Sequence, residues 1–560
     1  MGFKSTAIDK YWCKRFILIS NKVMKNFIYG GVLAVGLLFS SCNDTLDIDP
    51  NDSYSDATVW QDQNLIKMFV NDQYGALIGS DDFYRYSFFS DESYQKYNDN
   101  GCNYVRENIL TSDNIGAVSD LLNYWNTGYR YLYNLNLFFT NIQTSDVDDE
   151  FKQTMIGEMK FIRAFIYFRL IRSYGGVPII EEVFDINSDW SGVKRNSYDE
   201  CVDYIIKDLD EVITVLPDRP SERNRASANA ARALKSRVLL YAASPLNNPS
   251  NDREKWQKAA DAAKELFDKG YSLSDNYRDM FFDVTNDEYI FAKEYSETYS
   301  HWAGRNTASP GDGGFGFATP TQNMVDAYET IDGEIPILDT KTGEVNPNSI
   351  YDPKNPYKNR DPRFYDCIYY NGSTSIEGRV VETYQDGADM QTQDMTLTGY
   401  YLRKFVDESE PVSESYHYTM PYPFFRLAEI YLNYAEAEYH LGNEDVAREY
   451  VNKVRARKSV NMPPIDETGS TLLERIYHER QIELAFEGHR FFDLRRWRIA
   501  DKNPLYGLII NKTEDGFSYE RFMVSLASRE TDWKDAFFLL PIHYQEIQKS
   551  NNSLEQNPGY

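Results

Sequence analysis

The chain has 560 residues, more than one ordinary domain core holds, and with 42% hydrophobic and 15% aromatic residues it can form a packed interior. A formal net charge of −27 repels phosphate backbones, so nucleic acid is not an expected partner. Forty-four tyrosines suit a surface for half-polar ligands, because each ring carries an apolar face and a polar hydroxyl.

The N-terminal residues read as a targeting segment. Residues 1–23 are treated as an upstream leader or a misassigned start, and 24–41 as a lipoprotein signal peptide. The apolar run 27–39 is thirteen residues long, too short for a membrane span. The sequence Leu38-Phe39-Ser40-Ser41-Cys42 resembles a bacterial lipobox, which predicts that Cys42 is acylated. The alternative is a plain signal peptide followed by an incidental cysteine.

Residues 42–58 follow as a polar, acidic stretch that predicts a flexible tether behind the acylated cysteine. Beyond it, Cys102, Cys201 and Cys367 are widely spaced and form no zinc pattern. Packing and not a disulfide framework must therefore stabilise the fold. No metal or other cofactor is predicted.

Helical periodicity dominates the rest of the chain, so the fold is predicted to be mostly α. Trp125 opens a stripe with Tyr129, Tyr133 and Leu137 that is assigned to the core. The stop Gly175-Gly176-Val177-Pro178 ends one helix in the expected way. The predicted helices cover 155–174, 198–216, 227–243, 255–269, 426–441, 444–457 and 471–498.

Small residues indicate stacked helix hairpins. Ala435, Gly442 and Ala447 match the spacing of a tetratricopeptide hairpin, and the alanines of 230–263 indicate a second pair. Generic helix pairs are the alternative. The mature chain divides into a helical region 59–290, a loop-rich region 291–425 with short strands, and a helical region 426–560.

Catalytic motifs are not supported. Gly311–Gly316 spells a dinucleotide fingerprint, but prolines flank it where a strand and a helix are required. Charged residues crowd 479–496, and their alternation at helical spacing favours a structural ionic network over an acid-base site. Carboxylate pairs for glycoside hydrolysis stay open, because only their separation in space decides. No catalytic residue is therefore named.

Several motifs in order along the chain resemble the SusD/RagB family of Bacteroidetes outer-membrane lipoproteins. They extend from the tether to the C-terminus, so the resemblance spans nearly all of 42–560. The motifs are Cys42-Asn43-Asp44-Thr45-Leu46-Asp47, Phe161-Ile162-Arg163-Ala164-Phe165, Tyr174-Gly175-Gly176-Val177-Pro178, Asn359-Arg360-Asp361-Pro362-Arg363, Phe425-Arg426-Leu427-Ala428-Glu429, Glu487-Gly488-His489-Arg490-Phe491-Phe492-Asp493-Leu494-Arg495-Arg496-Trp497 and Gln556-Asn557-Pro558-Gly559-Tyr560.

The resemblance implies a SusD-like α-helical body with tetratricopeptide-like hairpins and without catalytic activity. It implies a lipoprotein anchored in the outer membrane that faces the cell surface. Its implied partner is a SusC-like TonB-dependent transporter, and its implied ligand is an oligosaccharide or polysaccharide. The quoted motifs are mostly scaffold residues, so none of them is a ligand site.

Two stretches have the chemistry that a sugar needs, a flat aromatic ring beside amide or charged groups. The first is the polar stretch 90–104, and the second is the loop 299–306. They resemble in position the family loops that hold ligand-stacking aromatics. Trp302 is the strongest single prediction, because an indole in a Gly/Asn-rich loop is hard to assign to a core. The predicted ligand residues are Trp302, Tyr299, Tyr94, Tyr97, Tyr104, Asn98 and Arg305.

Three other functions stay open. The same fold would support a RagB-like protein that captures peptides, with acidic residues facing basic side chains. A surface glycosidase would use two of the many carboxylates. A helical-repeat adaptor would bind only protein.

Overall fold

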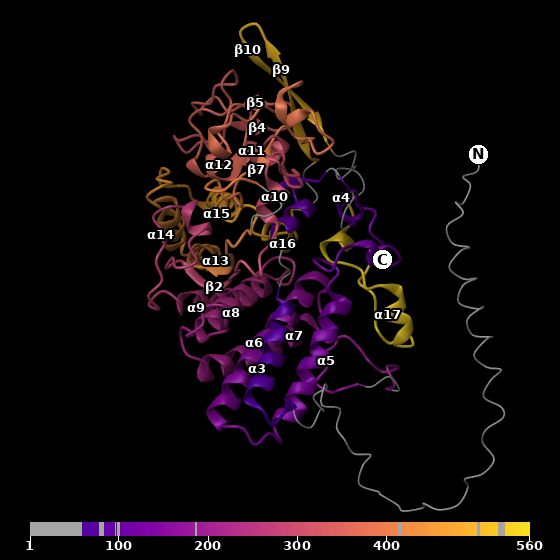
Figure 1. Cartoon of the computed structure of the whole chain (residues 1–560). Coiled ribbons are helices and arrows are strands. Elements are labelled where there is room, and N and C mark those ends of the chain that lie inside the picture. Colours follow the sequence, from indigo (N-terminus) through magenta and orange to yellow (C-terminus); the bar gives the residue numbers. More distant parts are fainter. Residues whose placement is uncertain are drawn as a thin grey trace, which may run out of the picture. The chain divides into compact units, whose positions relative to one another are not determined.

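The structure is a computed structural model that describes residues 59–77, 83–95, 97, 101–184, 188–412, 417–500, 504–524 and 533–560. Leader 1–23, signal peptide 24–41, tether 42–58 with Cys42, and Asn98 lie outside the described residues. The compact unit Trp60–Tyr560 is mostly helical with short strands, so the predicted fold class is confirmed (Figure 1).

Among the N-terminal helices, α6 (Asp149–Tyr174) is the central one and is buried on nearly every side. Asp148 caps α6 by accepting a hydrogen bond from the Phe151 N–H at 3.0 Å, so the helix begins earlier than predicted. Gly175, with φ of 76°, ends it at the predicted stop. These helices are α3 (Gln63–Gln73), α4 (Cys102–Arg106), α5 (Trp125–Ile142), α6 (Asp149–Tyr174), α7 (Tyr198–Val215), α8 (Ala228–Ala243) and α9 (Arg253–Lys264).

Stacked helices form the body, as the hairpin pattern predicts. Helix α7 packs on α6 and α8, and α8 packs on α9. Helix α13 (Leu427–His440) packs on α9 and α14 (Glu444–Arg455), with Ala435 and Ala447 fully buried. Gly442, with φ of 81°, makes the turn between α13 and α14.

The predicted helix 471–498 is wrong as a single element. It divides into α15 (Gly469–Glu483) and α16 (Arg490–Arg496). Between them, Phe486 and Gly488 have φ of 64° and 85°. Residues within a right-handed α-helix have negative φ, so the helix cannot continue through these two positions. The Glu487 carboxylate accepts hydrogen bonds at 2.8 Å from both Arg426 and Lys404. Cations that are distant in the sequence therefore stabilise the non-helical backbone between the two helices.

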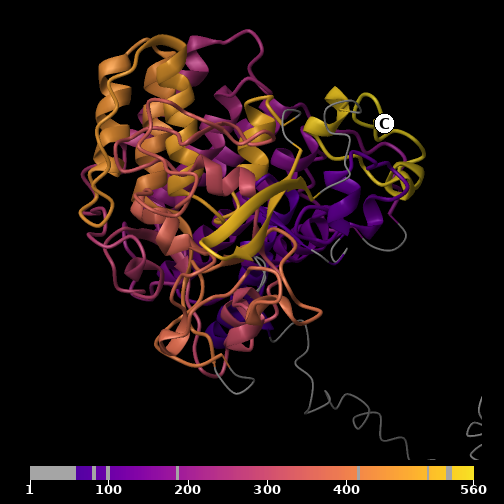
Figure 2. The same ribbon diagram turned by 90° about the horizontal axis from the view of Figure 1, so that it is seen from above.

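The middle of the chain is loop-rich, with short helices and two-stranded antiparallel sheets. Seen from above in Figure 2, the long hairpin β9–β10 (506–523) crosses the centre of the view, and β9 packs on the short helix Gln322–Ala327. The strand pairs are β1 (Ser93–Tyr94) with β3 (Thr319–Pro320), β2 (Tyr289–Lys293) with β8 (Tyr422–Arg426), β4 (Ile337–Asp339) with β5 (Glu344–Val345), β6 (Ile368–Tyr369) with β7 (Tyr401–Leu402), and β9 (Tyr506–Thr513) with β10 (Gly516–Met523). The short helices are α10 (Ala303–Thr307), α11 (Gln322–Ala327), α12 (Pro362–Cys367) and α17 (Tyr544–Lys549).

Aromatic packing ties the β2–β8 sheet to α6. The rings of Phe161 and Phe291 lie 5.4 Å apart, edge to face, and those of Phe165 and Phe424 lie 5.6 Å apart. Strand β2 is therefore fixed on the central helix, and the loop that follows it starts from a rigid support.

Candidate functional site

The chain leaves β2 through a tight turn that brings tyrosine to the surface. Ser296 and Tyr299 exchange two backbone hydrogen bonds of 3.0 Å, and the Tyr299 side chain is 53% exposed. The Tyr295 ring stacks beside it, with centroids 5.7 Å apart and planes at 15°. The Lys293 ammonium lies 5.4 Å from both ring centroids, a cation–π arrangement that holds the pair.

His301 anchors the next step of the loop. Its backbone N–H donates to the Tyr418 carbonyl at 3.1 Å, and its Nε2 is 3.1 Å from the Met420 carbonyl oxygen. Nδ1 accepts from the Ala303 N–H at 3.1 Å, so Nε2 carries the proton. Burial lowers the pKa of His301 to about 4, and the imidazole is neutral at neutral pH. His301 is thus a structural support for the residue that follows.

Trp302 precedes the first turn of α10 and is 45% exposed. The Arg305 guanidinium lies 5.3 Å from the Trp302 ring centroid and 4.7 Å from that of Phe315. Gly304 lets α10 approach its support, since a Cβ there would lie 2.3 Å from Tyr418 Cε1. Arg305 therefore positions a large exposed indole. Lys293, Tyr295, Tyr299, Trp302 and Arg305 are together called the aromatic turn.

A cleft of about 360 Å³ borders the aromatic turn at Tyr299 and Lys293. Its other walls come from distant parts of the chain and include Asn71, Glu222 and Arg225. Arg225 donates to Asn71 at 2.7 Å, and amide, carboxylate and guanidinium groups thus stand beside an exposed ring. This combination fits a ligand with an apolar face and a hydroxyl rim. We call it the Tyr299 cleft.

The other predicted stretch is held by different partners. Tyr94 lies in β1 beneath the Arg106 guanidinium, 4.4 Å from its ring centroid. The Tyr97 hydroxyl donates to the Gln393 carbonyl at 3.0 Å and faces Asp394 at 3.2 Å. Tyr104 is half-buried in α4. Pairing of β1 with β3 joins this stretch to the segment that follows the aromatic turn, and its ligand role remains a prediction.

Sequence reasoning identified Tyr299, Trp302 and Arg305 as one local group, and the structure places all three on the aromatic turn. The sequence carries no indication of the residues that form the other walls of the Tyr299 cleft. Asn71 and Arg225 come from α3 and from the segment before α8, so local pattern carries no signal for their meeting. The cluster of amide and charged groups arises only from the packing of these helices.

The charged residues of 479–496 form a buried ionic network, as predicted. Arg426 contacts Glu288 and Glu483 at 2.8 and 2.7 Å, and Arg363 contacts Glu479. Burial alone would raise the pKa of Glu483, but Arg457 and Arg426 lower it to about 2. These carboxylates are therefore ionised partners of arginine in the interior and form no open acid-base pair. Among the described residues, no group of three or more His, Cys, Asp or Glu could hold a metal ion.

The glycine-rich segment has the structure expected for a loop. Pro310–Asp312 forms a 3-10 turn, and Asp312 and Asp389 both bind Arg379, at 2.7 and 2.8 Å. The segment opens no α-helix, which agrees with the rejection of a dinucleotide-binding motif at these glycines. In the described part of the chain, no helix is long and apolar enough to cross a membrane.

Two family models match this chain. The SusD family model covers residues 287–560, and a model described as "Starch-binding associating with outer membrane" covers 44–240. A SusD-like protein, P25, from Formosa agariphila is 24% identical, over 94% of this chain and 99% of its own length.

Solved structures agree with this match. A SusD-like protein from Bacteroides fragilis has a TM-score of 0.76 at 29% identity, covering 90% of this chain and 99% of its own. A SusD-like carbohydrate binding protein from the same species has a TM-score of 0.74 at 26% identity, covering 88% and 99%. Because the two models together cover most of the chain and the fold follows the first of these structures over 90% of this chain, the chain belongs to the SusD/RagB family.

Proposed function

We propose that this protein binds oligosaccharides at the aromatic turn and the Tyr299 cleft. The observation that carries the proposal is the exposed indole of Trp302, fixed by Arg305 on a loop that His301 anchors. An exposed ring with restricted motion binds the C–H face of a sugar with little loss of entropy. The polar walls of the Tyr299 cleft supply partners for its hydroxyls.

Relatives support the ligand class. One matching family is described as starch-binding, and one of the Bacteroides fragilis structures is a SusD-like carbohydrate binding protein. The buried carboxylates of the ionic network argue against hydrolysis there, because each is paired with Arg or Lys. The proposed role is therefore capture of glycans without cleavage.

Calorimetry tests the proposal with the chain from Asn43 onward, which keeps the compact unit Trp60–Tyr560. It is titrated with plant, host and microbial oligosaccharides, with a peptide mixture in parallel. Saturable binding of one glycan class is expected, and Trp302→Ala should weaken it at least about tenfold. Phe517→Ala is the matched control, because Phe517 is also exposed, at 38%, and lies in β10.

Peptide capture is the second candidate. Glu222 and Glu294 line the Tyr299 cleft, and the chain carries a formal net charge of −27, which attracts basic side chains. Binding of peptides alone would support this function and contradict glycan capture. Release of reducing ends from any bound glycan would instead indicate a glycosidase.

We further propose that acylated Cys42 anchors the protein at the outer membrane, facing the cell surface. There it delivers glycans to a SusC-like TonB-dependent transporter. The supporting observations are the lipobox-like sequence before Cys42 and the family description that names outer-membrane association. Cys42→Ala should release the protein from the membrane fraction. A transporter barrel should co-purify with the wild-type chain from detergent, and its absence would contradict the pairing.

A further inference from the structure

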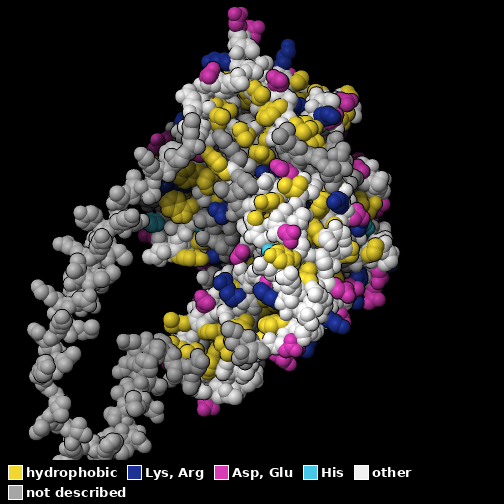
Figure 3. All heavy atoms as spheres, turned by 90° about the vertical axis from the view of Figure 1, so that its right-hand side faces the viewer, with side chains coloured by type: hydrophobic (Ala, Val, Ile, Leu, Met, Phe, Trp, Pro, Cys, Tyr) yellow, Lys and Arg dark blue, Asp and Glu magenta, His cyan; other side chains and the backbone are white. Residues whose placement is uncertain are grey.

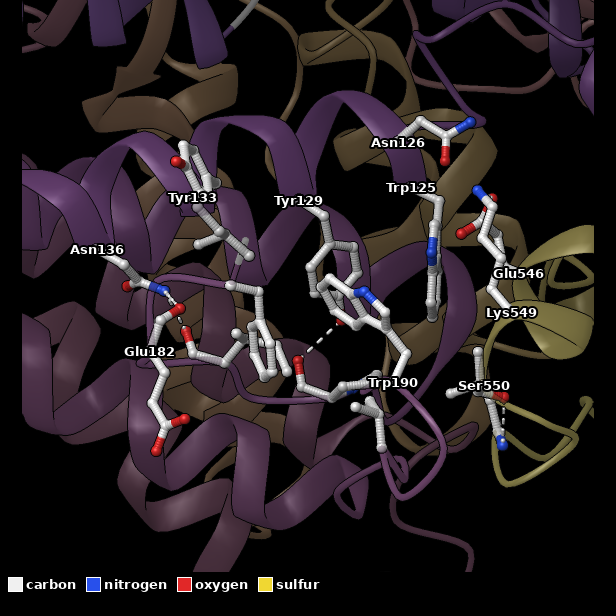
Figure 4. Close-up of a pocket in the computed structure, with 16 residues that line it drawn as sticks. Trp125, Asn126, Tyr129, Tyr133, Asn136, Glu182, Trp190, Glu546, Lys549 and Ser550 are labelled. Carbon is white, nitrogen blue, oxygen red and sulfur yellow. Dashed lines mark hydrogen bonds and ion pairs between the residues drawn. The ribbon is translucent and has the colours of Figure 1, made fainter. Parts of the chain in front are cut away.

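A second cavity, of about 420 Å³, lies between α5, the neighbouring segments 178–184 and 190–193, and α17. Figure 4 shows Trp125, Tyr129 and Trp190 directed into this space, while Glu546, Lys549 and Ser550 border it from α17 and its C-terminal cap. It shares no lining residue with the Tyr299 cleft. The volume is in the range of small-ligand sites. We call it the Trp190 cavity.

Hydrogen bonds between α5 and the facing segment 178–182 fix the walls of the cavity before any ligand binds. Tyr129 donates its hydroxyl proton to the Pro178 carbonyl at 2.8 Å. The Asn136 amide donates to the carbonyls of Ile180 and Glu182 at 2.9 and 3.1 Å. These contacts keep the segment 178–182 on α5, so a ligand would meet walls that already stand in place.

Aromatic rings make up most of the walls. Trp190 stacks on Phe184, with centroids 4.4 Å apart and planes at 29°, yet Trp190 is 41% exposed. The ring centroids of Trp125 and Tyr129 lie 5.1 Å apart. The core assignment of the α5 stripe is correct for Trp125, which is 7% exposed, but not for Tyr133, which is 42% exposed. The stripe faces a cavity because the chain after Pro178 does not fill it.

Four polar side chains border the rings and have no hydrogen-bond partner among the described residues. The side chains of Asn126, Tyr133, Glu182 and Trp190 make no hydrogen bond or ion pair within the part of the chain that the structure describes. They present an amide, a hydroxyl, a carboxylate and an indole N–H. Glu546 is different, because Lys549 contacts it at 2.6 Å. Figure 3 shows the face of the molecule that carries α5 and α17, where hydrophobic side chains reach the surface in several patches.

A pyranose ring matches both halves of this lining. Its C–H face stacks on an indole, and its hydroxyls pair with amide, carboxylate and hydroxyl groups at the edge. A purely apolar ligand would instead cover four polar groups without pairing them, which costs free energy. We propose that the Trp190 cavity is a second carbohydrate site, which binds one pyranose ring against Trp190. The proposal rests on the glycan-binding function proposed above.

Two sites on one body would act together on a long glycan. A polysaccharide bound at the aromatic turn would present further rings at high effective concentration to the Trp190 cavity, provided that it spans both. Long chains would then bind more tightly than short ones. Loss of either site would reduce this gain.

The test uses a glycan array to choose an oligosaccharide, followed by calorimetry with the chain from Asn43 onward. Trp190→Ala should remove one class of binding events and leave the class that Trp302→Ala removes. Tyr133→Phe and Glu182→Gln should each weaken the Trp190 class several-fold. The first removes a hydroxyl partner, the second removes the charge of a carboxylate acceptor, and both keep the shape. Phe517→Ala is the control, and unchanged thermal midpoints show that the variants fold.

Each failure has a separate meaning. If glycans bind and Trp302→Ala abolishes all binding while Trp190→Ala changes nothing, the second site is disproved and the proposed function stands. If no glycan on the array binds, both proposals fail. If Trp190→Ala weakens binding but Tyr133→Phe and Glu182→Gln do not, the sugar hydroxyls do not pair with these two groups, and the pyranose site proposed for the Trp190 cavity is wrong. If Trp190→Ala affects only co-purification of the transporter, the cavity is a protein contact instead.

Discussion

The carboxylate of Asp91 accepts two hydrogen bonds from the guanidinium of Arg490, each of 2.8 Å, across 399 residues of chain. The next residue, Glu92, accepts a hydrogen bond of 2.7 Å from the Phe486 N–H. The residues at the break between α15 and α16 therefore fix the position of the segment that leads into Tyr94. This explains why the left-handed backbone of Phe486, with φ of 64°, is tolerated.

Loss of the Asp91 carboxylate should destabilise the whole unit. Asp91 and Arg490 are 3% and 9% exposed, so Asp91→Asn leaves a cation buried without its partner. Such a change costs about 3–5 kcal/mol of unfolding free energy, measured by urea denaturation. Asp535→Asn is the control, because the Asp535–Arg498 pair has the same 2.8 Å separation but side chains that are 80% and 42% exposed. It should cost less than about 1 kcal/mol, and equal losses would contradict the role assigned to burial.

Glu92 should make stability depend on pH in the opposite direction from most carboxylates. Burial raises the pKa of Glu92 from 4.5 to about 7, because the interior disfavours the charged form. Between these values the folded protein binds a proton that the unfolded chain releases. Its contribution to stability is therefore complete below pH 4.5 and is lost as the pH rises to 7.

Comparison with Glu92→Gln isolates this residue from all other titrating groups. The unfolding free energy of the wild type, relative to that variant, should fall by roughly 3 kcal/mol between about pH 4.5 and pH 8. Urea denaturation at several pH values measures the difference. A constant difference across this range would show that Glu92 stays ionised in the folded protein.

Local pattern was sufficient for much of the scaffold. The α7 prediction is confirmed nearly to the residue because Ser197 and Glu200 form a capping box that acts within a few positions. The division between α15 and α16 could not be predicted, since Arg426 and Lys404 create it from far along the chain. The aromatic turn and the Trp190 cavity differ in the same way. Trp302 is identifiable from its own loop, whereas Trp190 meets Trp125 only after α5 packs against the segment that follows α6.

Tyr299 offers a test of which part of the aromatic turn binds the ligand. No partner for its hydroxyl is present among the described residues, while its ring stacks on Tyr295 and lies under Lys293. If the ring face binds sugar, Tyr299→Phe should keep the affinity within about twofold, and Tyr299→Ala should lower it about tenfold. Calorimetry with the glycan selected from the panel gives both numbers. Equal, large losses in the two variants would mean that the hydroxyl and not the ring contacts the ligand, and the stacking geometry proposed for this turn would then be wrong.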